Sequence, residues 1–151
     1  MIYLISKISK EAHKHNEHIA SIAGSYFDSK VFIPHMHNPY DTAHNELEFK
    51  VFNEDLNIMK RADIAVISMP IGRDCAAEIG WFCGANKYVC VFLVYSEYVS
   101  LNDQVALLKS DWMIKGFISE VFVDNVELYK ELIEDPIIGS KVTLLKDEYC
   151  V

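Results

Sequence analysis

The chain has 151 residues, a length that fits one domain with a single hydrophobic core. Its hydrophobic fraction is 51%, its charged fraction is 24%, and its formal net charge is -8 at pH 7. This acidic balance argues against duplex DNA or an anionic membrane surface as the main partner, because both attract basic patches. It leaves room for a small ligand, which only a local site has to attract.

The sequence also contains no segment that indicates export or membrane insertion. The apolar run over residues 1–6 ends at Lys7 and is too short for a secretory signal. No window approaches the roughly 20 apolar residues of a membrane span. The four cysteines form no CxxC pair. We therefore predict one domain over residues 1–151, in a cytoplasmic protein with reduced thiols.

Taken in chain order, apolar runs alternate with segments of helical periodicity. The predicted strands cover residues 2–6, 30–34, 63–69, 88–94 and 120–124. The predicted helices cover residues 9–25, 46–61, 74 to about 86, 101–110 and about 125–134, and a loop covers 35–45. Gly24 is expected to end the first helix and Asp74 to cap the third. The pattern assigns no element after Pro136.

The strands are continuous apolar runs, which are typical of a parallel sheet covered on both faces. We therefore predict an α/β fold. Its best match is a flavodoxin-like open sandwich with five parallel strands in the order 2-1-3-4-5 and helices on both faces. In such sheets, ligands bind beyond the carboxyl ends of the strands.

One carboxylate, Glu78, is the single charge between Cys75 and Ala85. Its helix is apolar nearly all round, so we expect it to be buried, with Gly80 and Gly84 packed closely against the sheet. Ionised carboxylates are rarely buried without a partner. A poorly hydrated glutamate in the first turns of this helix would face the crevice, where it suits a nucleophile. The simpler alternative is that Glu78 only interacts favourably with the positive end of the helix dipole and has no catalytic role.

Two further residues could reach the same crevice. Asp55 lies on the helix that leads into the third strand, although a solvated helix position would explain it as well. Tyr3 lies in the first strand, where its phenol could hydrogen-bond a carboxylate or simply pack in the core. Trp81 and Phe82 are expected in the core.

The loops at the strand ends supply the remaining candidates for substrate contacts. Ser6 ends the first strand, His35 and His37 follow the second, and Gly72 and Asp74 follow the third. The histidines suggest a metal site, but no cysteine or carboxylate completes a regular ligand pattern around them. We therefore predict no metal and no cofactor.

These segments together resemble the nucleoside 2-deoxyribosyltransferase family. The resemblance covers roughly residues 1–95 and rests on "VFIP", "NEDLNIMKRADIAVISM" and "DCAAEIGWFCGANKYVCVFLV". It implies that Glu78 attacks the sugar C1′, that Asp55 contacts the base or assists its departure, and that Tyr3 positions the glutamate. The implied reaction is retaining transfer through a covalent deoxyribosyl-enzyme. Nucleoside and free base would be its partners, and the family implies a homodimer or a higher homo-oligomer.

The chain departs from the family pattern in ways that bear on the substrate. Transferases often carry an aspartate six residues before the glutamate, where this chain has Gly72; Asp74 either replaces that acid or only caps the helix. A sister branch, which cleaves 2′-deoxynucleoside 5′-monophosphates, also resembles the chain. That branch holds phosphate with a glycine-rich first loop and a neighbouring subunit's serine. This chain has no such glycines, and Asp111 falls at the serine position.

We therefore expect a transferase acting on unphosphorylated nucleosides. A monophosphate N-glycosidase is the alternative, because Lys7, Lys10 and Arg73 could meet a phosphate as point charges. A non-catalytic nucleotide-binding module is the third possibility.

Overall fold

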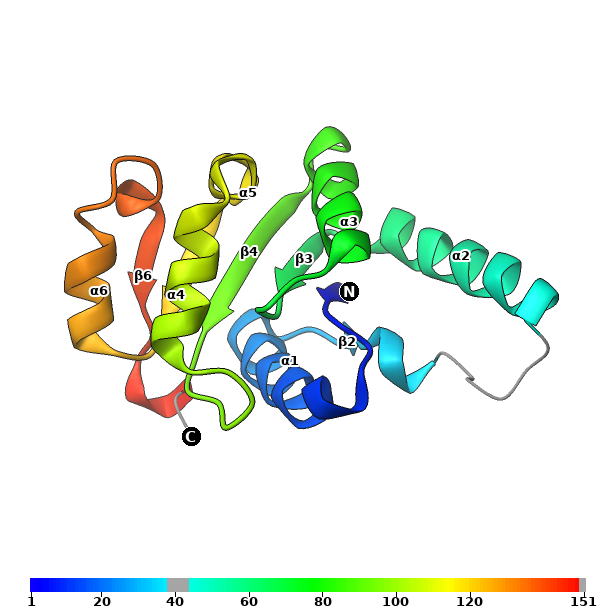
Figure 1. The fold of residues 1–151 in the computed structure, drawn as a ribbon, viewed down its shortest axis with the longest axis horizontal. Helices are drawn as coiled ribbons and strands as arrows, with labels where there is room; N and C mark the ends of the chain where they lie inside the picture. Colours follow the sequence, from blue (N-terminus) through cyan, green and yellow to red (C-terminus); the bar gives the residue numbers. More distant parts are fainter. Residues whose placement is uncertain (38–43, 150–151) are drawn as a thin grey trace.

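The computed structural model of the protein describes residues 1–37 and 44–149. Within them a parallel sheet runs in the order β2-β1-β3-β4-β5-β6 (Figure 1). Its strands are β1 (Ile2–Ile5), β2 (Val31–Phe32), β3 (Ile64–Ile67), β4 (Tyr88–Leu93), β5 (Glu120–Val123) and β6 (Val142–Leu144). The predicted flavodoxin-like fold and the order of its first five strands are confirmed. The sixth strand, which pairs with β5 at the edge of the sheet, was missed.

The helices of the described residues follow the strands in alternation. They are α1 (His13–Phe27), α2 (His44–Arg61), α3 (Arg73–Gly84), α4 (Leu101–Ser110), α5 (Trp112–Phe117) and α6 (Val126–Leu132). Short 3-10 turns are η1 (Lys10–Ala12), η2 (Pro34–Met36), η3 (Gly139–Lys141) and η4 (Asp147–Tyr149). The predicted loop over 35–45 overlaps η2 and the start of α2, and its residues 38–43 lie outside the described part. None of these helices combines the length and the apolar character of a membrane span.

Two predicted helix boundaries were wrong. Helix α1 continues past Gly24, because Asp28 adopts the left-handed conformation (φ 49°) and its backbone N–H bonds the Gly24 carbonyl. Aspartate is among the few residues that accept this conformation at low cost. Helix α3 begins at Arg73 with Gly72 as its N-cap, so Asp74 lies inside the first turn and does not cap the helix.

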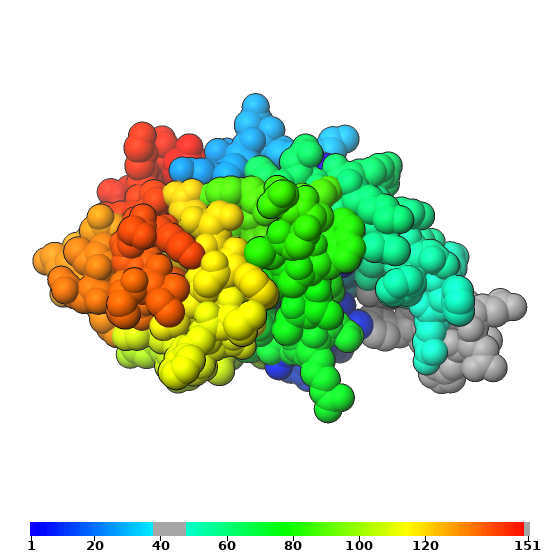
Figure 2. Space-filling view, turned by 90° about the horizontal axis from the view of Figure 1, so that it is seen from above, coloured from blue at the N-terminus to red at the C-terminus, as the bar shows by residue number. Residues whose placement is uncertain are grey.

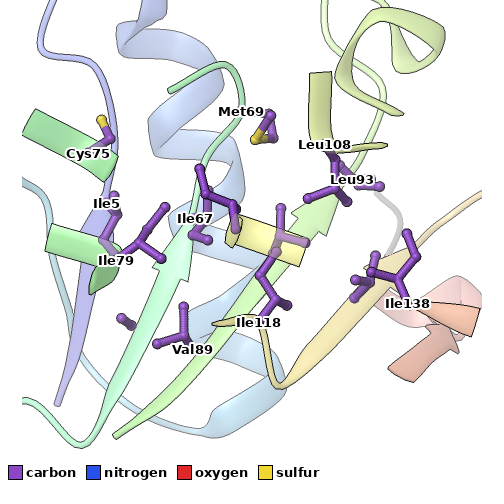
Figure 3. Packing of buried hydrophobic residues seen from close by; sticks show 14 of the residues in the cluster. Ile5, Ile67, Met69, Cys75, Ile79, Val89, Leu93, Leu108, Ile118 and Ile138 are labelled. Atoms are coloured by element: carbon purple, nitrogen blue, oxygen red, sulfur yellow. The ribbon is translucent and has the colours of Figure 1, made fainter. Parts of the chain in front are cut away.

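The core consists of two layers, one on each face of the sheet. Strand β1 shows the alternation: Tyr3 and Ile5 join the cluster under α3, α4, α5 and α6, whereas Ile2 and Leu4 join the cluster under α1. Figure 3 shows part of the first cluster, with Ile79 of α3 in the same group as Ile5 and Ile67 of the sheet. Helix α3 is thus fixed to the central strands.

Helix α3 buries one face only. Cys75, Ile79 and Phe82 face the sheet at helical spacing and are buried. A side chain added at Gly80 or Gly84 would meet nothing within 4 Å, so both glycines lie on the outer face. The expectation of a helix buried all round, with these glycines against the sheet, was wrong. Small residues fit an open surface as well as a close contact, and the sequence does not distinguish the two.

Helix α2 is attached to the body of the protein by one end. Figure 1 shows it running outward from α3, and Figure 2 shows it projecting beside α3. Its buried anchor is Met59, near the C-terminal end, and Ala62 just after the helix is buried too. Further from the body, Phe49 is 75% exposed and Phe52 is 63% exposed. One flank of this projecting helix faces α3.

Candidate active site

A pocket of about 610 Å³ lies between α2, α3 and the first strand. Its walls combine apolar side chains with several carboxylates. The residues that line it are Tyr3, Glu48, Val51, Phe52, Asp55, Leu56, Met59, Asp74, Ala77, Glu78 and Trp81. This volume is in the range of small-molecule sites in proteins. The pocket therefore has room for a nucleoside-sized ligand.

Helical spacing explains why these residues meet. On α3, the lining residues Asp74, Glu78 and Trp81 are four and three residues apart, so they form one stripe. On α2, Asp55 and Met59 are one turn apart and continue a stripe that begins at 48 and 51. The α3 stripe lies beside the face that packs on the sheet. Two helices thus present facing stripes across one pocket.

The carboxyl of Glu78 is held largely away from water. Burial raises its pKa to about 8, and the nearby charges of Asp55 and Asp74 act in the same direction. The Tyr3 phenol opposes them and favours the ionised form. One buried carboxyl oxygen, Oε2, has no hydrogen-bond partner among the described residues. Glu78 lies in the second turn of α3, where the helix dipole has little effect on a charge. Desolvation therefore determines the direction of its pKa shift.

Tyr3 forms the floor of the pocket. Its side chain is fully buried, and its ring stacks on Phe32 with ring centroids 5.5 Å apart and tilts against Phe82 at 5.6 Å. Burial and then the charge of Glu78 raise the phenol pKa, so Tyr3 stays protonated. Its hydroxyl makes no hydrogen bond of ordinary geometry with a described residue, yet it lies near enough to stabilise the Glu78 carboxylate. The structure thus brings Tyr3 and Glu78 together.

Asp55 is the third member of this group. Burial raises its pKa to about 6, with a smaller effect from Glu54, and its Oδ1 is buried without a hydrogen-bond partner among the described residues. Two neighbouring acids with raised pKa values titrate as a pair. Between about pH 6 and pH 8 the pair therefore holds one proton and one negative charge.

The charged side chains of the pocket are all acidic. Its carboxylates come from both helices, and among the described residues that line it there is no lysine, arginine or histidine. A dianionic group such as a phosphate would be repelled by these carboxylates. The lining therefore favours a neutral ligand with polar atoms over one that places a phosphate in this space.

The predicted contacts from the first two loops lie outside the pocket lining. Ser6 is buried, and its hydroxyl has no hydrogen-bond partner among the described residues. His35 is buried, stacks on His13 at 3.9 Å and approaches Glu17 at 3.3 Å. His37 is exposed and stacks on Phe32, the ring that supports Tyr3. Of these three residues, only His37 is linked to the floor of the pocket, through Phe32.

The loop after β1 contains no glycine and is fixed by hydrogen bonds of Asn16. The amide Nδ2 of Asn16 donates to the Lys7 carbonyl at 2.7 Å, and its Oδ1 accepts from the Ser68 hydroxyl at 2.9 Å. Asn16 is 1% exposed, so this network joins the first loop to the end of β3 in the interior. Lys7 then reaches over Gly72, where its Cε would lie 3.7 Å from an added side chain. A cation thus stands close to the start of α3.

Asp74 and Asp111 have different surroundings. Asp74 lines the pocket one turn before Glu78, so it can contact a ligand there. Asp111 caps α5 by accepting from the Ile114 amide at 3.0 Å, and it borders a separate hollow with Met69 and Ile71. It does not line this chain's pocket.

Sequence reasoning missed the apolar wall of the site. Phe52 and Trp81 both line the pocket, and Trp81 is half-buried, whereas only Phe82 is in the core as expected. The helical spacing of 48, 52, 55 and 59 could have indicated a common stripe on α2. Among the described residues, no group of three or more His, Cys, Asp or Glu side chains could hold a metal ion.

Comparison with known proteins supports the fold. No protein-family model matches the chain, and no curated protein matches it. Among solved structures, it is similar to a 2-deoxyribosyltransferase from the psychrotolerant bacterium Bacillus psychrosaccharolyticus, with a TM-score of 0.59 and 24% sequence identity. The chain shares the fold of that enzyme. The match covers 80% of this chain and 84% of the other, so the resemblance predicted from the sequence is confirmed for the fold.

Proposed function

We propose that the protein is a nucleoside 2-deoxyribosyltransferase that forms a covalent deoxyribosyl ester on Glu78. The observation that carries this proposal is a largely desolvated glutamate between a buried phenol and a second carboxyl, facing a pocket with aromatic walls. Perturbed carboxyls in a pocket of this size are typical of catalytic sites. The shared fold with a 2-deoxyribosyltransferase agrees with it.

In the first half-reaction, an ionised Glu78 oxygen attacks C1′ of a 2′-deoxynucleoside. The C1′–N bond breaks, and its electron pair leaves with the base. The shared proton lies mainly on Glu78, because its pKa is the higher, so the reactive form is the one in which this proton has moved to Asp55. The departing base takes the proton from Asp55, and the negative charge moves from Glu78 to Asp55. Tyr3 remains protonated and orients the attacking carboxylate. This is the logic of a retaining glycosidase applied to an N-glycosidic bond.

In the second half-reaction, a ring nitrogen of a new base attacks C1′ from the side that the first base left. The ester bond breaks and returns its electron pair to Glu78. The proton of the incoming nitrogen passes to Asp55, which restores the starting state. No cofactor takes part. The free thiols of Cys75, Cys83 and Cys90 fit the reducing cytoplasm in which we propose that the enzyme works.

The acidic lining supports an unphosphorylated nucleoside as the substrate. One observation favours the alternative, a monophosphate N-glycosidase in which water replaces the second base. Lys7 lies over Gly72 at the start of α3, where its ammonium and the free backbone N–H groups could meet a 5′-phosphate. The carboxylate of Asp74 in the same turn opposes that binding.

The proposed enzyme is a homodimer or a higher homo-oligomer. Trp112 is 78% exposed and Met113 is 66% exposed, next to Asp111 at the start of α5. Exposed apolar pairs of this kind are frequent in subunit contacts. Light scattering coupled to gel filtration should therefore give a mass above that of one chain.

A chromatographic assay tests the reaction. The enzyme is incubated with each 2′-deoxynucleoside and, separately, with each 5′-monophosphate, with and without an added free base. A new deoxynucleoside that carries the added base establishes the transferase. Release of free base from monophosphates alone would select the hydrolase, and no product from either set would favour a binding module. Glu78→Gln is the control, because it keeps the side-chain shape and removes the charge.

A further inference from the structure

Lys87 makes an unusual set of contacts with the end of α2. Its Nζ donates to the backbone carbonyls of Met59 at 3.0 Å, Lys60 at 2.7 Å and Ala62 at 2.5 Å. The last carbonyls of a helix have no partner within the helix, and a cation there also meets the negative end of the dipole. All three protons of the ammonium are thus directed at one helix end.

The backbone that carries Lys87 is itself fixed. Helix α3 ends at Gly84, and the chain then passes through a left-handed Asn86 (φ 59°). The Asn86 N–H bonds the Cys83 carbonyl, and the Lys87 N–H bonds the Phe82 carbonyl at 3.0 Å. This pair of bonds is a Schellman motif, which usually places glycine or asparagine at the left-handed position. Strand β4 begins at the next residue. Lys87 therefore projects from the junction of α3 and the central sheet.

The Lys87 contacts matter because α2 is supported mainly at this end. Met59 is 6% exposed and accepts one of the Lys87 hydrogen bonds, whereas Phe52 is 63% exposed. Figures 1 and 2 show the helix projecting from this attachment. A small tilt at the fixed end becomes a displacement of the pocket-lining residues further along α2. Asp55, one turn before Met59, is the polar group that such a tilt would carry away from Glu78.

We propose that Lys87 is a positioning residue that clamps the C-terminal end of α2 to the α3–β4 junction and so keeps Asp55 opposite Glu78. The expected loss of turnover rests on the proposed function, whereas the expected displacement of α2 does not. Lys87 touches no reacting atom. Without the clamp, α2 tilts away, water enters the pocket, and the two carboxyls no longer share one environment.

The pKa of Glu78 distinguishes a clamp from a simple charge. Loss of a distant positive charge raises the pKa of a carboxyl, whereas hydration of Glu78 and removal of the Asp55 charge both lower it. NMR titration of the Glu78 side-chain carboxyl is therefore made in the wild type, in Lys87→Met and in Arg61→Met. Arg61 is exposed at the same helix end, and its carbonyl is not one of those that Lys87 binds. We expect Lys87→Met to lower the pKa by about half a unit or more, and Arg61→Met to leave it unchanged or slightly raised.

Kinetics provides the second readout. Misplacement of a catalytic group by about 1 Å can cost on the order of 100-fold in rate. We expect Lys87→Met to lower kcat about 10-fold to 100-fold, to change KM less, and to move the alkaline limb of the pH–rate profile, which the pKa of Glu78 sets, downward. Lys87→Gln, which can still donate to one or two carbonyls, should show a smaller change in the same direction. A residue that only stabilises the fold would leave the limb where it is.

The outcomes separate the two proposals. A wild type with no turnover would refute the proposed function, and the NMR titration would still test the clamp. A Glu78 pKa that is unchanged or raised in Lys87→Met would overturn the clamp, whatever the activity. If Lys87→Met does not fold, Lys87→Gln takes its place in the titration. Its shorter amide cannot make all three hydrogen bonds, so the pKa of Glu78 should still fall, and an unchanged pKa would overturn the clamp equally.

Discussion

The two helices that form the pocket are supported in different ways. Helix α3 lies on the central strands and buries Cys75, Ile79 and Phe82 against them, so Glu78 has a rigid base. Helix α2 touches the body near Met59 and exposes Phe52 over most of its surface. A nucleophile such as Glu78 must be placed accurately. An acid such as Asp55, which has to reach bases of different shape, benefits from a helix that can move. The chemistry is expected to depend on α3 and its fine control on α2.

Replacement of Glu78 should have the largest effect, because it removes the group that forms the proposed ester. We expect Glu78→Gln to lower turnover by about 10⁴-fold or more, since the nucleophile is lost. Steady-state assays of base exchange measure the loss, and circular dichroism checks that the fold is kept. Activity within tenfold of the wild type would remove Glu78 from the reaction.

Asp55→Asn tests the contribution of α2. Loss of a general acid typically costs about 10² to 10⁴ in rate, so kcat should fall within that range while KM changes less. Glu54→Gln is the matched control, because Glu54 is the exposed neighbour on the same helix. An effect on KM alone would make Asp55 a binding residue and would weaken the distinction between nucleophile and acid.

The pH profile tests whether the two helices act as a pair. The active form carries one proton on the two carboxyls, so kcat/KM should be bell-shaped, with limbs near the pKa of about 6 at Asp55 and about 8 at Glu78. Asp55→Asn should remove one limb. A profile that is flat from pH 5 to pH 9 would contradict the coupling.

Tyr3→Phe should reduce turnover less than the two preceding variants, because it affects Glu78 on α3 and leaves Asp55 on α2 unchanged. The phenol lowers the pKa of Glu78, so its removal should move that pKa upward. At pH 7 we expect turnover to fall about tenfold, in line with one lost hydrogen bond to a charged group. A turnover at pH 7 that equals the wild-type value would mean that Tyr3 only packs in the core.

Stability gives the smallest expected signal. The folded-state pKa of Glu78 is raised from 4.5 to about 8, so folding favours its protonated form. That stability is fully present below pH 4.5 and is lost as the pH rises through about 8. At pH 8.5, Glu78→Gln should therefore be more stable than the wild type by roughly 1–3 kcal/mol in free energy of unfolding, and it should unfold at a higher temperature. The difference should disappear near pH 4, and a constant difference at both pH values would contradict the assignment.

The sequence indicated those parts of the candidate site that depend on local pattern. An isolated charge in an apolar helix indicated Glu78, and helix and strand order placed Asp55 and Tyr3 near the same edge of the sheet. The first five strands were also clear, because buried parallel strands are continuous apolar runs. These features need only neighbours along the chain.

The features that the sequence did not reveal depend on contacts between distant segments. Whether Gly80 faces the sheet or solvent is decided by the rotation of α3, which Ile79 and Phe82 set through the core. The contacts of Lys87 with the end of α2 join residues more than 20 positions apart. Strand β6 has three residues, too few for its pattern to be distinguished from a loop.

Detection of the ester on Glu78 tests the central claim most directly. The enzyme is mixed with a 2′-deoxynucleoside in the absence of any acceptor base, quenched in acid within the first turnover, digested and analysed by peptide mass spectrometry. We predict a deoxyribosyl adduct on the peptide that contains Glu78, and its disappearance when an acceptor base is added before the quench. Base release without an adduct on that peptide, or an adduct that persists in Glu78→Gln, would contradict the account.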